Sequence, residues 1–200
     1  MTGRPGLEGE DGLDAERARL FALLGRLLAA PPDQALLAGL AGLRGDDTLL
    51  GRAFAGLAAA AAATGPAALE REFFELFIGV GRGELLPYAS WYLTGFLHER
   101  PLADLRAELR RLGAERAPGL AEPEDHIAFE CEVLAGLIEG RFALAGPEAA
   151  GAFFARHLRP WAGRFFADLE GAAAARFYRA VGSLGRTAVE IEQAAAELPG

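Results

Sequence analysis

The most informative segment of the sequence is Ala121-Glu122-Pro123-Glu124-Asp125-His126-Ile127-Ala128-Phe129-Glu130, which places acids, a proline and a histidine directly before a long apolar repeat. Pro123 suits the first turn of a helix, because its φ angle is preset and it needs no amide partner. The carboxylates of Glu122, Glu124 and Asp125 would lie where the helix dipole favours negative charge. We therefore predict a helix that opens at Pro123.

Beyond this start, apolar residues recur at helical spacing. The intervals are four, three and four residues, at Ile127, Cys131, Leu134 and Ile138. This is the spacing of one helix face, so the helix should run to about residue 141. His126 and Glu130 fall inside the apolar arc as i, i+4 neighbours, whereas Asp125 should point away from it, toward solvent or a neighbouring loop.

Two polar side chains thus interrupt a face that should be buried, and burying either without a partner would be costly. One interpretation is that His126 and Glu130 satisfy each other, or that His126 caps a nearby carbonyl. The other is that both lie on the wall of a groove that receives another molecule. The residues alone leave both interpretations open.

Length and composition favour one helical domain. The chain has 200 residues, of which 52% are hydrophobic and 24% charged, so it can bury a sizeable core. β-Branched residues are few, and Ala, Leu, Arg and Glu fill long periodic segments. We predict an all-α, single-domain bundle of about eight to ten helices over residues 13–198, preceded by a flexible tail at residues 1–12.

The expected helix boundaries follow from caps and prolines. We expect helices that open at Asp14, at Asp33, near Asp47, after Gly65, at Pro87, at Pro101, at Gly146 and near Ala172, with a kink or break at Pro160. The segment 85–97 carries Tyr88, Trp91 and Tyr92 and is apolar almost all round. It could be a central core helix, the wall of a peptide-binding groove, or both.

Charge and sorting signals limit the possible partners and location. A net charge of −8 argues against binding of nucleic acid and favours a basic partner.

The only cysteine, Cys131, cannot form an internal disulfide and should be a small buried hydrophobe. The acidic N-terminus does not resemble a secretory signal, and the apolar run at residues 53–63 is too short for a bilayer. We expect a soluble cytoplasmic protein without stable membrane insertion.

Catalytic and cofactor motifs are not supported. Neither Ser90 nor Ser183 lies in a nucleophile-elbow pattern. The glycine-rich segment 79–84 lacks the Lys-Ser/Thr ending of a phosphate loop. A metal site could be imagined from acids and histidines around residues 122–130 together with His157, but no metal-binding repeat is present. We therefore expect no enzyme activity, no metal and no cofactor.

Four landmarks resemble those of the TorD/DmsD/NarJ family of redox-enzyme maturation chaperones. They occur in order as Phe73-Phe74-Glu75-Leu76-Phe77, Pro87-Tyr88-Ala89-Ser90-Trp91-Tyr92-Leu93, Glu122-Pro123-Glu124-Asp125-His126 and His157-Leu158-Arg159-Pro160-Trp161. The resemblance extends from about residue 15 to 195. One departure is Ala89, at a place where relatives often carry a polar or acidic residue, which puts a peptide contact there in doubt.

The resemblance implies a chaperone that binds the twin-arginine signal peptide and the apo catalytic subunit of a molybdopterin-dependent oxidoreductase. It would hold the subunit until the cofactor is inserted and delay its export. The client remains open among formate dehydrogenase, dimethyl sulfoxide or trimethylamine N-oxide reductase, and nitrate reductase. A monomer and a homodimer are both compatible with the sequence. The family pattern implies binding roles for Asp125 and His126 and for the aromatic segment. With the residues beside them, the expected peptide-binding set is Tyr88, Ser90, Trp91, Tyr92, Glu122, Pro123, Glu124, Asp125, His126, Phe129 and Glu130.

A twin-arginine leader is a basic pair followed by an apolar run, so its receptor needs carboxylates beside an apolar groove. We expect Glu122, Glu124 and Asp125 to meet the arginines, and the aromatic residues Trp91, Tyr92 and Phe129 to cover the apolar run. Two rival functions are a helical scaffold or regulator that does not recognise a leader and a small metal- or nucleotide-dependent enzyme.

Overall fold

Helices form all the regular structure in the residues that the computed structural model describes, which are 7–114, 122–146 and 148–197. These ranges hold ten α-helices and two π-helical segments, so the predicted all-α class is confirmed. In chain order they are α1 (Leu7–Ala29), α2 (Gln34–Ala41), α3 (Leu49–Ala62), α4 (Pro66–Phe73), η1 (Phe74–Ile78), α5 (Ala89–Thr94), α6 (Arg100–Leu112), α7 (Ile127–Ile138), α8 (Ala149–Phe153), η2 (Phe154–Leu158), α9 (Ala162–Gly171) and α10 (Phe177–Ala196).

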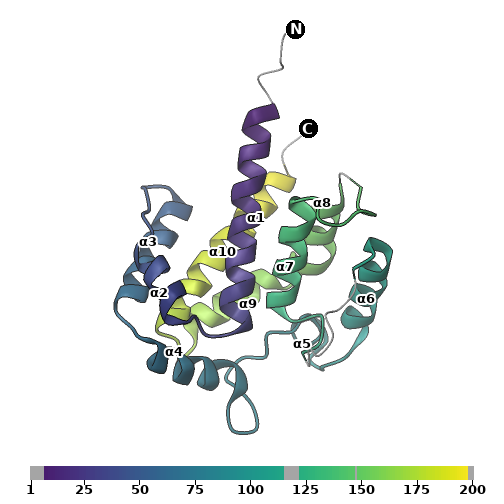
Figure 1. Ribbon diagram of the computed structural model, residues 1–200. Coiled ribbons are helices and arrows are strands. Elements are labelled where there is room, and N and C mark those ends of the chain that lie inside the picture. The colour runs from purple at the N-terminus through teal and green to yellow at the C-terminus, as the bar shows by residue number, and fades with distance from the viewer. Residues whose placement is uncertain (1–6, 115–121, 147, 198–200) are drawn as a thin grey trace.

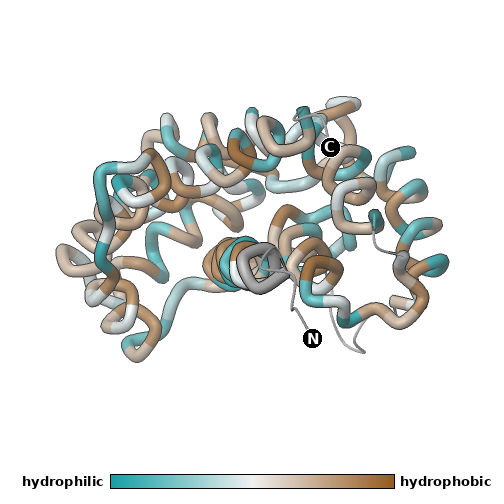
Figure 2. Tube along the Cα trace, turned by 90° about the horizontal axis from the view of Figure 1, so that it is seen from above, coloured by the Kyte–Doolittle hydropathy of each residue, from teal (hydrophilic) through white to brown (hydrophobic). Residues whose placement is uncertain are grey.

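Helix α1 is the element around which the others gather. It stands in the middle of Figure 1, with α2, α3 and α4 on one side and α5 to α8 on the other, and the view from above in Figure 2 places it centrally as well. It packs along α7. A Cβ on Gly25 would lie 3.0 Å from the carbonyl oxygen of Ala128 and 2.9 Å from Glu132 Cγ, so glycine permits this close approach.

Helix α10 joins the rest of the bundle from behind α1. It packs against α9, α3 and α1. Its first backbone amides are held by the buried carboxylate of Glu72 on α4, which accepts hydrogen bonds from the N–H groups of Arg176 (2.8 Å), Phe177 (3.2 Å) and Tyr178 (2.7 Å). A carboxylate at this position satisfies amides that have no partner inside the helix and complements the helix dipole.

Several boundaries agree with the sequence. The side chain of Asp33 accepts a hydrogen bond from Leu36 N (2.8 Å) as the N-cap of α2, and Pro66 is the first residue of α4. The break expected at Pro160 is confirmed, because η2 ends at Leu158 and α9 begins at Ala162. The prediction for Asp14 was wrong: α1 begins earlier, at Leu7, and Asp14 lies inside it. Residues 1–6 of the expected tail lie outside the described residues.

The predicted start at Pro123 of the helix that runs to about residue 141 was also wrong. Helix α7 begins at Ile127, and His126 is its N-cap, with Nδ1 accepting a hydrogen bond from Ala128 N (3.1 Å). The preceding residues cannot join the helix because His126 has extended backbone angles and pairs with Tyr88 in an isolated antiparallel bridge. Pro123 therefore lies in a turn, where its carbonyl accepts from His126 N (3.2 Å).

Among the described residues, no single helix is long and apolar enough to cross a membrane. The bent pair Leu49–Ala62 and Pro66–Ile78, which is broken by 112°, meets the criteria of length and composition alone.

Candidate functional site

A cleft of about 320 Å³ opens beside the bridge between Tyr88 and His126. We call it the acidic cleft. It lies between the end of α1, the α4–η1 segment, the turn before α7 and the first turns of α7 itself. Its walls are Leu28, Ala29, Phe73, Phe77, Ile78, Pro87, Tyr88, Glu122, Pro123, Glu124, His126, Ala128, Phe129 and Glu132.

Short backbone pairing fixes the two segments that meet at the cleft. Ala89 N donates to the carbonyl of Asp125 (2.9 Å), and Ile127 N donates to the carbonyl of Pro87 (2.9 Å). The side chain of Asp125 adds a third link, because its Oδ2 accepts a hydrogen bond from Ser90 N (2.9 Å). Asp125 is only 1% exposed, so its carboxylate holds the start of α5 and does not face the cleft.

His126 forms part of the cleft wall and is held in a fixed orientation. Its Nδ1 caps α7, and its ring packs edge-on against Tyr88 with centroids 5.1 Å apart. Burial lowers the pKa of His126 to about 4, although the nearby carboxylates of Glu122 and Asp125 oppose this shift. The imidazole is therefore neutral at pH 7 and contributes a polar, uncharged surface.

The acidic lip consists of Glu122 and Glu124 on the turn and Glu132 on α7. The Tyr88 hydroxyl donates a hydrogen bond to Glu122, and burial together with this bond raises the pKa of Tyr88. Arg106 on α6 donates from Nε (2.9 Å) and Nη2 (2.7 Å) to Glu124 Oε2. The lip therefore already holds a guanidinium from the chain's own α6.

The floor of the cleft is apolar and partly aromatic. Phe73 and Phe77 contact each other edge-on, with ring centroids 5.0 Å apart, and both pack against Tyr178 of α10. Leu28 closes the floor from α1, and Phe129 lines it from α7. The cleft thus combines three carboxylates at its rim with a surface that can bury apolar side chains.

Of the eleven residues expected to bind a peptide, six lie on this cleft: Tyr88, Glu122, Pro123, Glu124, His126 and Phe129. Ser90 is fully buried at the start of α5. Tyr92 packs on Trp161 and Phe165 and donates from its hydroxyl to Asp168 (2.9 Å). The guanidinium of Arg82 lies over the ring of Trp91.

Glu130 also lies away from the acidic cleft. It accepts a hydrogen bond from Trp161 Nε1 (3.2 Å) rather than pairing with His126, and burial raises its pKa well above the usual range. It borders a separate cavity of about 420 Å³ between α5, α6 and η2, which also includes His157. The structure therefore separates His126 and Glu130 onto two cavities, although they are one helical turn apart.

Sequence reasoning did not assign the other eight wall residues to the cleft, among them Glu132, Phe73, Phe77 and Leu28. A signal for Glu132 was present, since it follows Phe129 by three residues and must share its side of α7. Phe73 and Phe77 were named only as part of the first family landmark, without a role in binding. Their role in the cleft depends on Leu28, which comes from a distant part of the chain and could not be placed beside them from spacing.

Cys131 is fully buried, as predicted. Within the described ranges, no group of three or more histidine, cysteine or acidic side chains is arranged to hold a metal ion.

Comparison with known proteins shows which family the chain belongs to. The family model for the nitrate reductase delta subunit matches residues 43–167, a range that includes all four landmark segments. The chain belongs to the TorD/NarJ family of chaperones. The resemblance inferred from the sequence is therefore confirmed, and this family is not enzymatic.

Curated relatives of this TorD/NarJ-family chain are named chaperone protein TorD. The protein from Aliivibrio fischeri (strain ATCC 700601 / ES114) is 38% identical over 72 residues, which are 35% of this chain and 34% of the relative. The protein from Vibrio cholerae serotype O1 (strain ATCC 39315 / El Tor Inaba N16961) is 35% identical over 101 residues, 46% of each chain. The matches thus span between a third and a half of the length of these relatives.

Proposed function

We propose that the chain is a maturation chaperone that binds the twin-arginine leader of an immature molybdopterin-dependent oxidoreductase in the acidic cleft. Membership of the TorD/NarJ family supports the general role. The observation that carries the finer proposal is that Glu122, Glu124 and Glu132 rim a cavity with a floor of Leu28, phenylalanines and Pro87. A basic pair followed by an apolar run is the ligand that such a surface complements.

An arginine of the leader is recognised when its guanidinium replaces that of Arg106 on the Glu124 carboxylate. Arg106 approaches this carboxylate with two N–H groups, and its side chain remains 45% exposed, so it can leave into solvent. A guanidinium from the leader replaces it with equivalent hydrogen bonds. A lysine presents a single ammonium group and cannot reproduce the two-donor contact, which favours arginine.

The apolar floor supplies most of the affinity. An exposed ion pair contributes about 0–1 kcal/mol, whereas each Å² of apolar surface removed from water contributes about 25 cal/mol. Phe129 and the paired rings of Phe73 and Phe77 offer that surface to the leader's apolar run. The carboxylates then orient the leader and select it, and Asp125 and His126 act by fixing the turn that carries Glu122 and Glu124.

The chaperone function follows from binding of the leader in the acidic cleft. While the leader lies in the cleft, the export machinery cannot engage it, so the apo catalytic subunit stays in the cytoplasm until its cofactor has been inserted. Formate dehydrogenase, dimethyl sulfoxide or trimethylamine N-oxide reductase, and nitrate reductase are the candidate clients.

Titration calorimetry tests the proposal with a twin-arginine leader peptide and its twin-lysine version. We expect the arginine peptide to bind more tightly. Glu132→Gln should weaken its binding by up to about fivefold, because a rim charge pair worth at most about 1 kcal/mol is lost. Glu70→Gln is the matched control, since Glu70 is exposed on α4 and does not line the cleft. Equal affinity for both peptides, unchanged by Glu132→Gln, would refute selection by the cleft and favour a scaffold that ignores leaders.

A further inference from the structure

The acidic cleft is too small for the whole apolar run of a leader. Its volume is about 320 Å³, whereas a cavity of about 150 Å³ already holds one benzene-sized group. The cleft therefore takes about two large apolar side chains of a ligand. A longer apolar run must continue over the surface that adjoins the cleft, so the character of that surface decides how the leader lies.

One large apolar side chain belongs both to the cleft and to the outer surface. Among the large hydrophobic side chains that are exposed in the described residues, only Ile78 lines the acidic cleft, and it is 54% exposed. Phe74, four residues earlier in η1, is 43% exposed, and Val80, two residues later, is 98% exposed. We call these three side chains the η1 ridge. An exposed apolar surface that continues from a cleft is typical of an interaction site.

The turn that carries Val80 is fixed by its own backbone. Gly79 N donates a hydrogen bond to the carbonyl of Phe74 (2.7 Å). Gly79 has a φ of 61°, and a Cβ on it would lie 2.0 Å from the carbonyl oxygen of Arg82, so this position requires glycine. The chain therefore holds Val80 in water in a defined place, where its side chain is available to a ligand.

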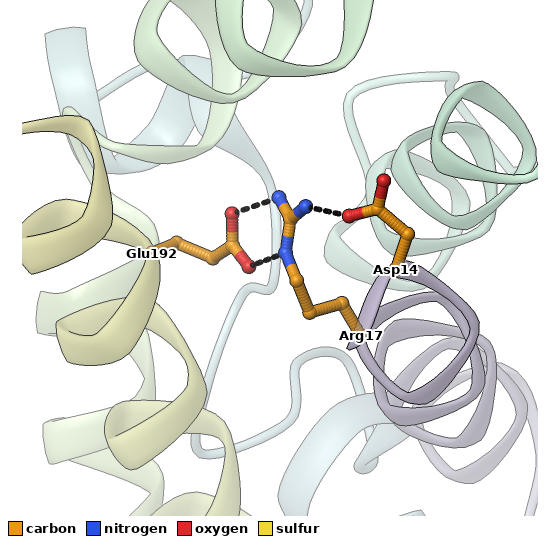
Figure 3. Close-up of polar contacts among 3 residues, drawn as sticks. All are labelled: Asp14, Arg17 and Glu192. Atoms are coloured by element: carbon orange, nitrogen blue, oxygen red, sulfur yellow. Dashed lines mark hydrogen bonds and ion pairs between the residues drawn. The ribbon is translucent and has the colours of Figure 1, made fainter. Parts of the chain in front are cut away.

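A second, mainly apolar groove does not continue from the acidic cleft. It lies between α1, α3 and α10, has a volume of about 380 Å³, and shares no described wall residue with the cleft. Figure 3 shows how its rim is tied, because Arg17 of α1 donates to both carboxylate oxygens of Glu192 on α10 (2.7 and 2.8 Å) and to Asp14 (2.5 Å). The cleft meets α1 at Leu28 and Ala29, at the opposite end of the helix.

We propose that the η1 ridge binds the part of the apolar run that the cleft cannot hold. The leader then lies with its arginines at Glu124 and with its apolar run leading past Ile78 to Val80. This inference rests on the proposed function, to which it adds a direction and a second contact surface. In Figure 1 the loop after η1 hangs below the lower end of α1, whereas α5, which is hydrogen-bonded to the turn before α7, lies to the right of that end.

Charge on the rest of the rim favours this direction. Glu122 and Glu124 lie on the turn before α7, and Glu132 lies on α7. An apolar run that left the cleft over these side chains would remove carboxylates from water without giving them a partner, which is costly. Over the η1 ridge the same run covers apolar side chains, which is favourable.

Titration calorimetry with two twin-arginine peptides tests the ridge. One peptide carries the full apolar run, and the other ends after about two apolar residues, which the cleft can hold alone. Val80→Ser should weaken binding of the full peptide roughly threefold to tenfold, because two methyl groups lose their contact with the run, and should leave the short peptide unchanged. Ile78→Ser should weaken both, since Ile78 also lines the cleft.

The matched control is Leu49→Ser. Leu49 is 66% exposed at the start of α3 and does not line the cleft, so its replacement should change neither affinity. Circular dichroism should give equal melting temperatures for Val80→Ser, Leu49→Ser and the original chain, because both side chains are exposed.

Disulfide trapping tests the direction. The single native cysteine, Cys131, is fully buried, so the Val80→Cys variant carries one accessible thiol. Under mild oxidation it should cross-link at least tenfold faster to a leader peptide with a cysteine at the end of its apolar run than to one with a cysteine before its arginines. The opposite order overturns the proposed direction.

The outcomes separate this inference from the proposed function. A full peptide that binds the original chain and ignores Val80→Ser overturns the ridge and leaves the proposed function standing. Equal weakening of the full and the short peptide by Val80→Ser overturns the ridge as well, because the loop would then act on the cleft and not on the run. A chain that binds neither peptide refutes the proposed function, and the ridge with it.

Discussion

Replacing Asp125 with alanine should destabilise the protein by about 2 kcal/mol. The carboxylate accepts a hydrogen bond from Ser90 N (2.9 Å) in a site where both residues are buried, so the substitution leaves a backbone donor without a partner. Losing a buried hydrogen bond to a charged group costs about 1.5–3 kcal/mol. For a chain of this size we expect the melting temperature to fall by about 4–8 °C.

Urea unfolding followed by far-ultraviolet circular dichroism measures this loss of stability. The midpoint urea concentration should fall, and the dependence of the unfolding free energy on urea concentration should stay unchanged. Asp125→Asn is the matched control, because the amide oxygen can still accept from Ser90 N. It should retain most of the stability and bind a twin-arginine peptide within about twofold of the original chain. Unchanged stability of Asp125→Ala would refute the structural role, and loss of peptide binding by a stable Asp125→Asn would show direct contact with the leader.

Two further predictions concern packing and pH. Gly185→Ala should lower the free energy of unfolding by about 1–3 kcal/mol in the same urea assay, because a Cβ there would lie 2.1 Å from the buried ring of Phe166. Gly56→Ala, inside α3 with open space around it, should raise the free energy of unfolding by about 0.5–1 kcal/mol. Equal effects of the two substitutions would contradict the packing. The pKa of His126 is lowered from 6.5 to about 4, so the unfolded chain takes up the proton first as the pH falls. The contribution of the neutral imidazole to stability should be complete above about pH 6.5 and lost as the pH falls toward 4, on the order of 3 kcal/mol. Replacing it with asparagine, which preserves an N-cap, should flatten stability between those pH values, and a slope equal to that of the original chain would exclude this histidine as its source.

Local signals in the sequence predicted much of the helix pattern. Asp33 and Pro66 mark helix starts that the structure reproduces, because caps and N-terminal prolines act within one turn. The apolar intervals from Ile127 to Ile138 identified the buried face of α7, and all the residues of that stripe up to Leu134 are fully buried. The four landmark segments indicated the family, which comparison confirmed.

The parts that sequence reasoning missed depend on contacts between distant segments. Helix α7 starts at Ile127 rather than Pro123 because the chain pairs with Pro87 and Ala89, which no local pattern encodes. Tyr92 was expected in the peptide groove, but its contacts with Trp161 and Asp168 depend on where α9 packs. Residue type predicted the chemistry of the acidic cleft, whereas only the fold determined which acids and aromatic rings border it.

Helix α10 has a consequence for how the protein is made. It leaves the ribosome after the other described helices, yet Arg17 near the start of the chain and Glu72 on α4 both depend on it for their buried or partly buried partners. Tyr178 of α10 also supports the phenylalanine floor of the acidic cleft. The floor of the acidic cleft is therefore fully supported only once α10 has been made, so a nascent copy that ends before residue 177 would leave Phe73 and Phe77 without Tyr178 and the Glu72 carboxylate without two of its three amide partners.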